Sequence, residues 1–366
     1  MKKKLLALLT CGMMFFVSAC GSSDVMVLTP YGDAIIKDDA GAAGQTAKPA
    51  QETKEVKEEA KPETQAVESS SDLIKVGFAQ VGSESDWRMA QTQSMKEAFT
   101  KENGFEFTFV NCNNDPDVQK QTISDFVDQK LQYIILDPIM EDGYEEVLTK
   151  AKDANIPVIV VDRNISADSS LYTCWVGSDF AQEGADAASW LAEYLEKNGR
   201  GSEDINILTI LGSEGASATI GREKGFADKM LSNWKMLDAQ SGDFTEEGGF
   251  AVMNAFLKQY QDIDVVVCQN DNEAYGAADA IKQAGLTCGP QGDIIIISFD
   301  ATKGGFQRMI DGDINVDVEC NPLEGPTVAE LIKKLHNGET VEPIQYMKEG
   351  VYPAETAAQT IGSRSY

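Results

Sequence analysis

The stretch that decides the fold is IPVIVVDRN, at positions 156–164. Its centre, 158–161, is an unbroken run of β-branched residues after a proline, which is typical of a strand buried on both faces. The run continues without a glycine turn into an acid and a base, Asp162 and Arg163. A charged pair directly after a buried strand requires a chemical explanation.

Apolar strands of this kind alternate with amphipathic stretches from Asp72 to the C-terminus. The expected strands are LIKVGFAQ, FEFTFVNC, YIILD, PVIVVD, YTCWVGS, INILTILG, DVVVCQN, DIIIISFD and NVDVEC. The expected helices cover 88–102, 116–130, 179–198, 216–232, 246–260 and 271–285. This alternation predicts an α/β fold with parallel sheets that carry helices on both faces.

A weak internal repeat predicts two lobes rather than one large sheet. Asp137 and Asp162 follow successive strands of the first half, and Asn270 and Asp300 follow successive strands of the second. We therefore expect two doubly wound parallel-sheet lobes joined by a multi-strand hinge. The expected boundaries are 72–177 plus 322–350 for the N-terminal lobe and 178–321 plus 351–366 for the C-terminal lobe.

The N-terminus has the pattern of an export signal. Three lysines precede an apolar run that is too short for an ordinary membrane span, and VSACG follows it. A cysteine at the cleavage point resembles the lipobox of bacterial lipoproteins, which implies that residues 1–19 are removed and that Cys20 carries lipid. Residues 40–71 lack aromatic residues and are rich in Ala, Glu, Lys and Pro, so we expect 20–71 to act as a disordered tether.

Charge and cysteine content exclude several classes of function. The net charge is −28, and the loss of three lysines with the signal takes it to −31. A chain this acidic is expected not to bind nucleic acid, which requires Lys and Arg contacts to phosphates. The five cysteines beyond Cys20 include no C-x-x-C pair, which argues against a complete disulfide framework and against a zinc site. DGDIN, at 311–315, lacks the other ligands of a calcium loop, and we interpret it as a turn.

The residues just past the expected strands are the place to look for a binding site. In open α/β sheets, ligands bind outside the carboxyl ends of the strands. These positions hold acids, arginines, amides and a tryptophan: Glu84, Trp87, Arg88, Asp162, Arg163, Arg222, Asn270, Asp300 and Asn321. Carboxylates and amides pair with hydroxyls, arginine offers a rigid fork of donors, and an indole face covers apolar C–H surface. The combination suits a sugar.

Six segments carry a resemblance to a known family: VGFAQVGSESDWRMAQ, IPVIVVDRN, GSEGASATIGREKGF, CQNDNEAYGAADAI, SFDAT and VECNPLEGP. In this order they resemble the type I periplasmic sugar-binding proteins, the ribose/galactose-binding family of ABC transporters. QVGSESDWR looks closest to the galactofuranose-binding subgroup. The resemblance implies that the nine residues above bind a monosaccharide between two lobes that close on it.

By this resemblance Asp162 and Arg163 would bind adjacent hydroxyls of one ring, and each would partly neutralise the other. The same resemblance implies an ABC permease as the partner, whereas the export signal and the lipobox predict an extracytoplasmic, lipid-anchored protein. We expect a monomer without a cofactor or a metal. The sequence leaves open whether Trp175 stacks on sugar or packs between the lobes.

Two other functions remain open. A surface glycosidase could use Asp162 and Asp300 as paired carboxylates, but arginines beside both acids would favour the ionised form over the raised pKa that an acid catalyst needs. A sensory subunit that presents bound sugar to a membrane kinase or a chemoreceptor would use the same fold. A repressor of this fold would need a DNA-binding helix-turn-helix in place of the export signal.

We predict that Cys20→Ala releases the protein from membranes, because a lipid on this cysteine would be its anchor. The measurement is the distribution of protein between membrane and soluble fractions, together with the mass of the mature N-terminus. A variant that stays with the membranes, beside a wild type without lipid mass, would contradict the lipobox interpretation.

Overall fold

A computed structural model describes residues 73–366 of the chain. The expected signal peptide, Cys20 and the tether lie outside the described residues. Between 73 and 366, no helix has both the length and the apolar character needed to cross a membrane.

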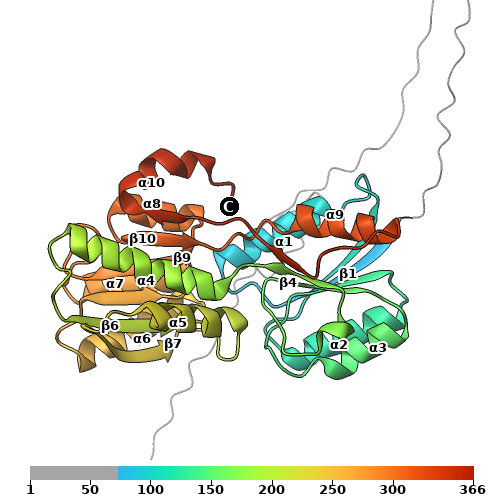
Figure 1. Cartoon of the computed structure of the whole chain (residues 1–366), viewed down its shortest axis with the longest axis horizontal. Helices are drawn as coiled ribbons and strands as arrows, with labels where there is room; N and C mark the ends of the chain where they lie inside the picture. Colours follow the sequence, from blue (N-terminus) through green and yellow to red (C-terminus); the bar gives the residue numbers. More distant parts are fainter. Residues whose placement is uncertain (1–72) are drawn as a thin grey trace, which may run out of the picture. The chain divides into compact units, whose positions relative to one another are not determined.

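The first lobe is built on a six-stranded parallel sheet with the order β11-β5-β4-β3-β1-β2. Its strands are β1 (Ile74–Gln80), β2 (Phe105–Asn111), β3 (Tyr133–Leu136), β4 (Val158–Val161), β5 (Cys174–Gly177) and β11 (Ile344–Tyr346). The helices α1 (Asp86–Ala98) and α9 (Gly325–His336) pack on one face, and α2 (Pro116–Asp128) and α3 (Glu145–Asp153) pack on the other (Figure 1). Every residue of β4 is buried, as its β-branched run predicts.

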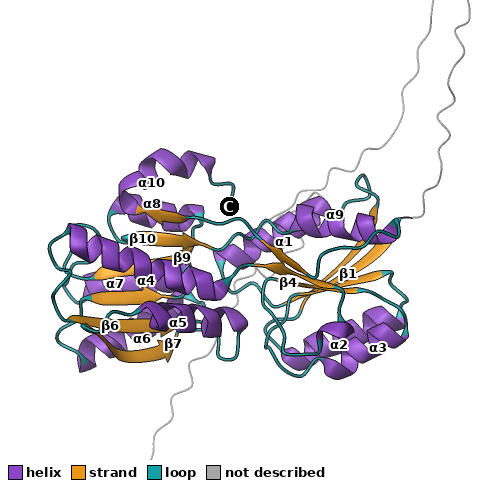
Figure 2. Ribbon diagram, viewed as in Figure 1, coloured by secondary structure: helices purple, strands orange, loops and turns teal. Residues whose placement is uncertain are grey.

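The second lobe has a sheet with the order β12-β10-β9-β8-β6-β7. Its strands are β6 (Ile205–Leu211), β7 (Trp234–Ser241), β8 (Val265–Cys268), β9 (Ile295–Asp300), β10 (Val316–Glu319) and β12 (Val351–Pro353). The helices α4 (Phe180–Lys197) and α5 (Ser217–Lys229) cover one face; α6 (Glu246–Gln259), α7 (Asp271–Gln283), α8 (Lys303–Asp311) and α10 (Ala354–Thr360) cover the other (Figure 2). Only β12 runs antiparallel, against β10.

The two sheets have the same order of equivalent strands, so the predicted α/β fold with two doubly wound lobes is confirmed. β4 and β9 occupy equivalent places, and Asp162 and Asp300 come at their carboxyl ends. The chain crosses between the sheets three times: after β5, after β10, and between β11 and β12. The residue boundaries of the lobes given above stay a prediction.

DGDIN is a turn, as expected. Gly312 ends α8 with a left-handed φ of 89°, a conformation that glycine adopts without strain. Asp313 forms salt bridges with Lys282 at 2.6 Å and with Arg308 at 3.1 Å. These two salt bridges provide the Asp313 carboxylate with charged partners from the protein itself.

Helices α4 and α5 pack with their backbones almost touching. A Cβ atom on Gly225 would lie far inside van der Waals contact of the Ala181 carbonyl oxygen, and one on Gly184 would do the same with the Arg222 carbonyl oxygen. Glycine at 225 is therefore required by the close approach, although it is a poor helix former. The contact fixes α5, and so Arg222, against α4.

We predict that Gly225→Ala lowers the free energy of unfolding by about 1–3 kcal/mol, the usual effect of overpacking. Helix propensity alone would give the opposite sign, because alanine is better than glycine in a helix by roughly 1 kcal/mol. In thermal melts, the melting temperature should fall by roughly 2–4 °C for each kcal/mol of unfolding free energy that is lost. Lys229→Ala, at an exposed position of the same helix, is the control and should stay within about 0.5 kcal/mol. A melting temperature for Gly225→Ala at or above that of the wild type would refute the packing argument.

Candidate binding site

One cavity gathers side chains from the carboxyl ends of both sheets. It is lined by eight of the residues predicted from the sequence: Glu84, Trp87, Arg88, Asp162, Arg163, Arg222, Asn270 and Asp300. Five further residues complete the lining: Ser85, Phe180, Ala218, Phe244 and Cys320. The parallel topology explains the convergence, because it places all these strand ends at one edge of each sheet.

Asn321 is the exception among the predicted residues. It does not line the cavity; its amide donates to the Lys348 carbonyl oxygen at 3.4 Å, and its Oδ1 accepts from the Leu323 N–H at 3.0 Å. The preceding residue, Cys320, lines the cavity instead. Neighbouring positions of an extended segment point to opposite sides, so an error of one residue reverses the assignment.

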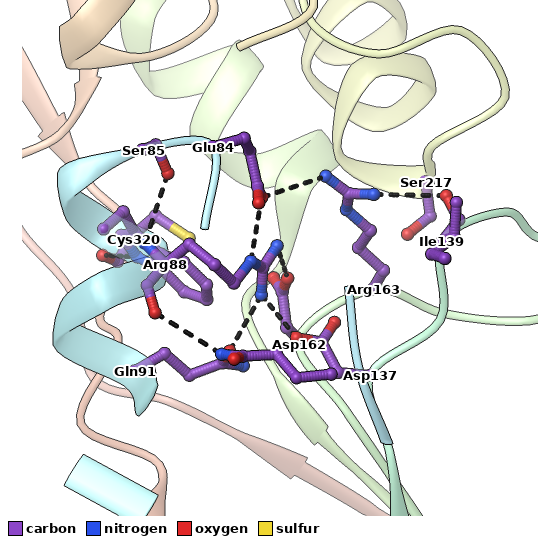
Figure 3. A network of polar contacts seen from close by, with 12 residues as sticks. Glu84, Ser85, Arg88, Gln91, Asp137, Ile139, Asp162, Arg163, Ser217 and Cys320 are labelled. Atoms are coloured by element: carbon purple, nitrogen blue, oxygen red, sulfur yellow. Dashed lines mark hydrogen bonds and ion pairs between the residues drawn. The ribbon is translucent and has the colours of Figure 1, made fainter. Parts of the chain in front are cut away.

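Arg88 organises the N-terminal side of the cavity (Figure 3). Ser85 caps α1 and accepts a hydrogen bond from the Arg88 N–H, which places this arginine in the first turn. The guanidinium is almost fully buried and forms ion pairs with Glu84 at 2.9 Å, Asp137 at 2.5 Å and Asp162 at 2.8 Å. Burial by itself would lower the pKa of Arg88, but these three carboxylates outweigh it and raise the pKa well above the ordinary value. Arg88 therefore stays protonated and positively charged.

The structure explains the charged pair after β4 differently from the sequence. Asp162 has a left-handed φ of 57°, and its N–H donates to the Val176 carbonyl oxygen and to Glu324 Oε1. Its carboxylate pairs with Arg88 rather than with Arg163. The expectation that Asp162 and Arg163 neutralise each other is therefore wrong.

Arg163 turns to a different set of partners. Its Nη1 donates to the Ile139 carbonyl oxygen at 3.1 Å, and its Nη2 lies 3.8 Å from Glu84 Oε1. The side chain is 2% exposed, and its guanidinium faces the ring of Phe244. Asp162 and Arg163 thus reach the cavity from separate parts of the polar network, because the left-handed turn at Asp162 sends their side chains apart.

The C-terminal side repeats this arrangement with other residues. Arg222, on α5, donates to Glu183 at 2.6 Å and lies 3.7 Å from Asp300. Asp300 ends β9 with a φ of 108°, which is uncommon for a residue other than glycine. Burial raises the pKa of Asp300 well above its ordinary value, although Arg222 counteracts this. Equivalent strands of the two lobes therefore end in acids with positive φ, each near an arginine.

Asn270 has a capping role as well as a place in the cavity wall. Its Oδ1 accepts from the Glu273 N–H at 2.8 Å and so caps α7. Its amide donates to the Phe244 carbonyl oxygen at 3.0 Å, while the Phe244 N–H donates to Glu273 Oε1 at 2.9 Å. Phe244 has a φ of 60°, and these two bonds hold it in that conformation.

The aromatic and apolar lining was largely missed in the sequence. Phe244 follows β7, a strand end like the others, and the same reasoning applied there would have found it. Phe180 begins α4 directly after the first crossing. Trp87 packs with both phenylalanines, and its Nε1 donates to the Cys320 carbonyl oxygen at 2.7 Å. Trp175, by contrast, packs in the core of the first lobe, and its Nε1 donates to the Asp162 carbonyl oxygen.

The cavity is nearly filled by its own side chains. The free space is about 30 Å³, room for only one or two water molecules. Hydrogen bonds join residues of the two lobes around it, from the Asn164 N–H to Ser217 Oγ at 2.7 Å and from the Asp86 N–H to Asn272 Oδ1 at 3.1 Å. In this arrangement of the lobes, the free space is smaller than a monosaccharide. A larger groove of about 710 Å³ lies between α1 and α9, away from these residues.

Comparison with known proteins agrees with this geometry. A model of the periplasmic binding protein domain matches residues 76–340. The galactofuranose-binding protein YtfQ of Escherichia coli is 37% identical over 295 residues, which cover 79% of this chain and 90% of that protein. The chain belongs to the periplasmic binding protein family.

Solved structures extend the comparison. A crystal structure from Mycobacterium smegmatis in complex with β-D-fucofuranose has a TM-score of 0.76 and 38% identity, covering 80% of this chain and 95% of that one. The periplasmic binding protein of the arabinose ABC transporter from a Shewanella species, bound to α- and β-L-arabinofuranose, has a TM-score of 0.74 and 35% identity over the same shares. The resemblance to the type I family is confirmed. Like its homologues, this periplasmic binding protein is a solute-binding protein and not an enzyme.

A pH dependence of stability follows from Glu273, the residue that holds Phe244. Burial raises the pKa of Glu273 from 4.5 to about 8, although hydrogen bonds from backbone N–H groups counteract this. Between these two values the folded protein keeps a proton that the unfolded chain has released. The free energy of unfolding therefore falls as pH rises through this window.

We predict that Glu273→Gln removes this dependence. From about pH 5.5 to about pH 7.5, the stability of the variant relative to the wild type should rise by up to about 2.7 kcal/mol, the limit for one proton. Melting curves at both pH values measure it. Glu247→Gln changes the same charge at an exposed position of α6 and should show no such trend. A stability difference between Glu273→Gln and wild type that does not vary with pH would mean that Glu273 is ionised in the folded protein.

Proposed function

We propose that the protein binds a monosaccharide in the cavity between its lobes and delivers it to an ABC importer. The observation that carries the proposal is the composition of this one cavity, where carboxylates, guanidiniums, an amide and aromatic rings converge from both sheets. A buried sugar needs a partner for every hydroxyl, because an unmade hydrogen bond costs about 1–3 kcal/mol. This lining supplies acceptors and donors together.

The proposed ligand is a sugar in its furanose form. Among the relatives compared above, YtfQ is a galactofuranose-binding protein, and the two solved structures contain fucofuranose and arabinofuranose. In this proposal Asp162 and Asp300 accept hydrogen bonds from ring hydroxyls, and Arg163 and Arg222 donate to ring or hydroxyl oxygens. Trp87, with Phe244 and Phe180, covers the apolar C–H surface of the ring.

We further propose that the protein works outside the cytoplasm as a monomer, tethered by lipid on Cys20, with a membrane permease as its partner. The export signal and VSACG support the anchor. The relationship to the binding component of an arabinose ABC transporter supports the permease. The lobes would open to admit sugar and close on it, as hinge proteins do.

A thermal-shift screen of the purified protein against pentoses and hexoses tests the proposal. The set should include arabinose, galactose, fucose, fructose and ribose, with uronic acids and amino acids as non-ligand classes. A sugar at 100 times its Kd should raise the free energy of unfolding by about 2.7 kcal/mol. Stabilisation by amino acids but by no sugar would reject the proposed ligand class.

We predict that Asp162→Ala, Arg163→Ala and Asp300→Ala each weaken binding of the best sugar by about 30-fold to several-thousand-fold. Loss of one partner in a buried charged hydrogen bond costs roughly 2–5 kcal/mol, and 1.4 kcal/mol is tenfold in Kd. Calorimetric titration gives the affinity. Asp311→Ala, an exposed acid at the end of α8, is the matched control and should bind as the wild type does.

Melting curves of the ligand-free variants separate binding from folding. If the three residues only stabilise the strand ends, melting temperatures will fall while the folded fraction binds sugar normally. That result would remove these side chains from the proposed binding site.

A further inference from the structure

The three crossings between the lobes meet at a second polar cluster, which adjoins the cavity described above and shares Cys320 with its lining. Ser178 lies in the first crossing, Cys320 in the second and Glu349 in the third, and Glu183 comes from the first turn of α4. One carboxylate oxygen of Glu183, the Cys320 sulfur and one carboxylate oxygen of Glu349 lie within 4.8 Å of one another. Spacings of this size between a thiol and two carboxylates suit ligands of a single metal ion.

Glu183 provides an independent observation that points to a ligand at this cluster. Its side chain is 3% exposed, and its Oε2 accepts from Arg222 Nε at 2.6 Å. Its Oε1 is buried and has no hydrogen-bond partner among the described residues. Arg222 engages one oxygen, and the thiol of Cys320 is a weak donor to this carboxylate. A buried carboxylate oxygen with no better donor than a thiol is unfavourable.

The other two members of the cluster are also acceptors or weak donors. Glu349 accepts hydrogen bonds from the Asn321 N–H at 2.9 Å and from the Ser178 hydroxyl. The Cys320 sulfur lies 3.3 Å from Ser178 Oγ. Arg222 forms an ion pair with Glu183, and its positive charge also acts on Cys320 and on Glu349. The group therefore offers several acceptors and few strong donors.

A solvent-connected cavity reaches two of these residues, Glu183 and Glu349. Its volume is about 200 Å³, and it is lined in part by five acids: Asp179, Glu183, Asp186, Glu319 and Glu349. Over the part of the chain that the structure describes, this lining includes no basic residue. A cleft lined by charges of one sign concentrates counter-ions, so the cavity is an entry path for cations.

We propose that Glu183, Cys320 and Glu349 bind a divalent transition-metal ion of the zinc type at the hinge. Thiolate and carboxylate are ligands that zinc accepts together, whereas calcium and magnesium require oxygen alone. When the metal binds, the thiol releases its proton to solvent, and so does either carboxyl that is protonated. The sequence predicted no metal because it has no close ligand spacing; here residues 183, 320 and 349 come together only through the three crossings.

The site would couple metal binding to lobe movement. Its ligands come from α4 and from two of the crossings, so an ion would fix these segments relative to one another. If the metal favours one arrangement of the lobes, its binding changes the affinity of any ligand between them, and the coupling is reciprocal. The proposal of a metal site holds whichever ligand the cavity binds.

Titration of the full chain with Co²⁺ tests the proposal, since cobalt can replace zinc and a thiolate–cobalt bond gives an absorption band in the near ultraviolet. We expect one Co²⁺ per chain, with the band lost in Cys320→Ser and the ion displaced by Zn²⁺ but not by Ca²⁺. Glu349→Gln and Glu183→Gln should each weaken binding at least tenfold. Cys288→Ser, which removes another buried thiol of the same lobe, is the control and should leave the band unchanged.

Two results would overturn the proposal. One is a wild type without the band at millimolar Co²⁺, which would leave the cluster as a hydrogen-bonded group that holds protons. The other is a band that survives in both Cys320→Ser and Glu349→Gln, which would place the metal elsewhere. Since Glu349 is partly exposed and lies outside the sugar cavity, Glu349→Gln keeps the test valid if Cys320→Ser fails to fold.

Discussion

The burial of the Arg88 guanidinium among three carboxylates is the constraint on which the N-terminal side of the site depends. Glu84 precedes α1, Asp137 follows β3 and Asp162 follows β4, so one side chain joins three strand-end loops. Removing a partner from such a group leaves a buried charge uncompensated, which is more costly than the intact network is stabilising. The network therefore contributes more to geometry than to stability. It fixes the direction of Asp162 and leaves Arg163 to point elsewhere.

The second lobe reaches a similar result with a smaller network. Arg222 is bound by Glu183 and the Gln269 carbonyl oxygen and approaches Asp300, while Glu273 and Asn270 hold Phe244. In both lobes an acid at a strand end adopts a positive φ that would be unfavourable in a free chain. Surrounding hydrogen bonds must impose such a conformation, and it is commonly found where a side chain is positioned for binding. Both lobes therefore place an acid with a positive φ near a buried arginine, Asp162 with Arg88 in one and Asp300 with Arg222 in the other.

The fold and the location of the cavity could be predicted from the sequence because both follow from topology. Apolar runs alternate with amphipathic stretches, and parallel strands must end at one edge, so Asp162, Arg222 and Asp300 had to converge. The pairing of charges could not be predicted in this way. Asp162 and Arg163 are adjacent in sequence, but the positive φ of Asp162 separates their side chains, and no local pattern announces that conformation. The position of Asn321 could not be predicted for a related reason. The hinge segment has no regular period, and Cys320 lines the cavity in place of Asn321.

Glu183 is the residue that joins the cavity to the hinge. One of its oxygens holds Arg222, whose guanidinium lines the cavity, and the other belongs to the cluster where the crossings meet. If the lobes move as proposed, the path of the crossings changes, and a displacement of Cys320 or Glu349 would alter the surroundings of Glu183. Because packed interiors shift between discrete arrangements rather than deform smoothly, such a change would reach Arg222 directly. Through the Glu183 carboxylate, a change at the hinge can therefore displace Arg222 in the binding cavity. In the opposite direction, a ligand that binds Arg222 can displace Glu183 and so affect the hinge cluster.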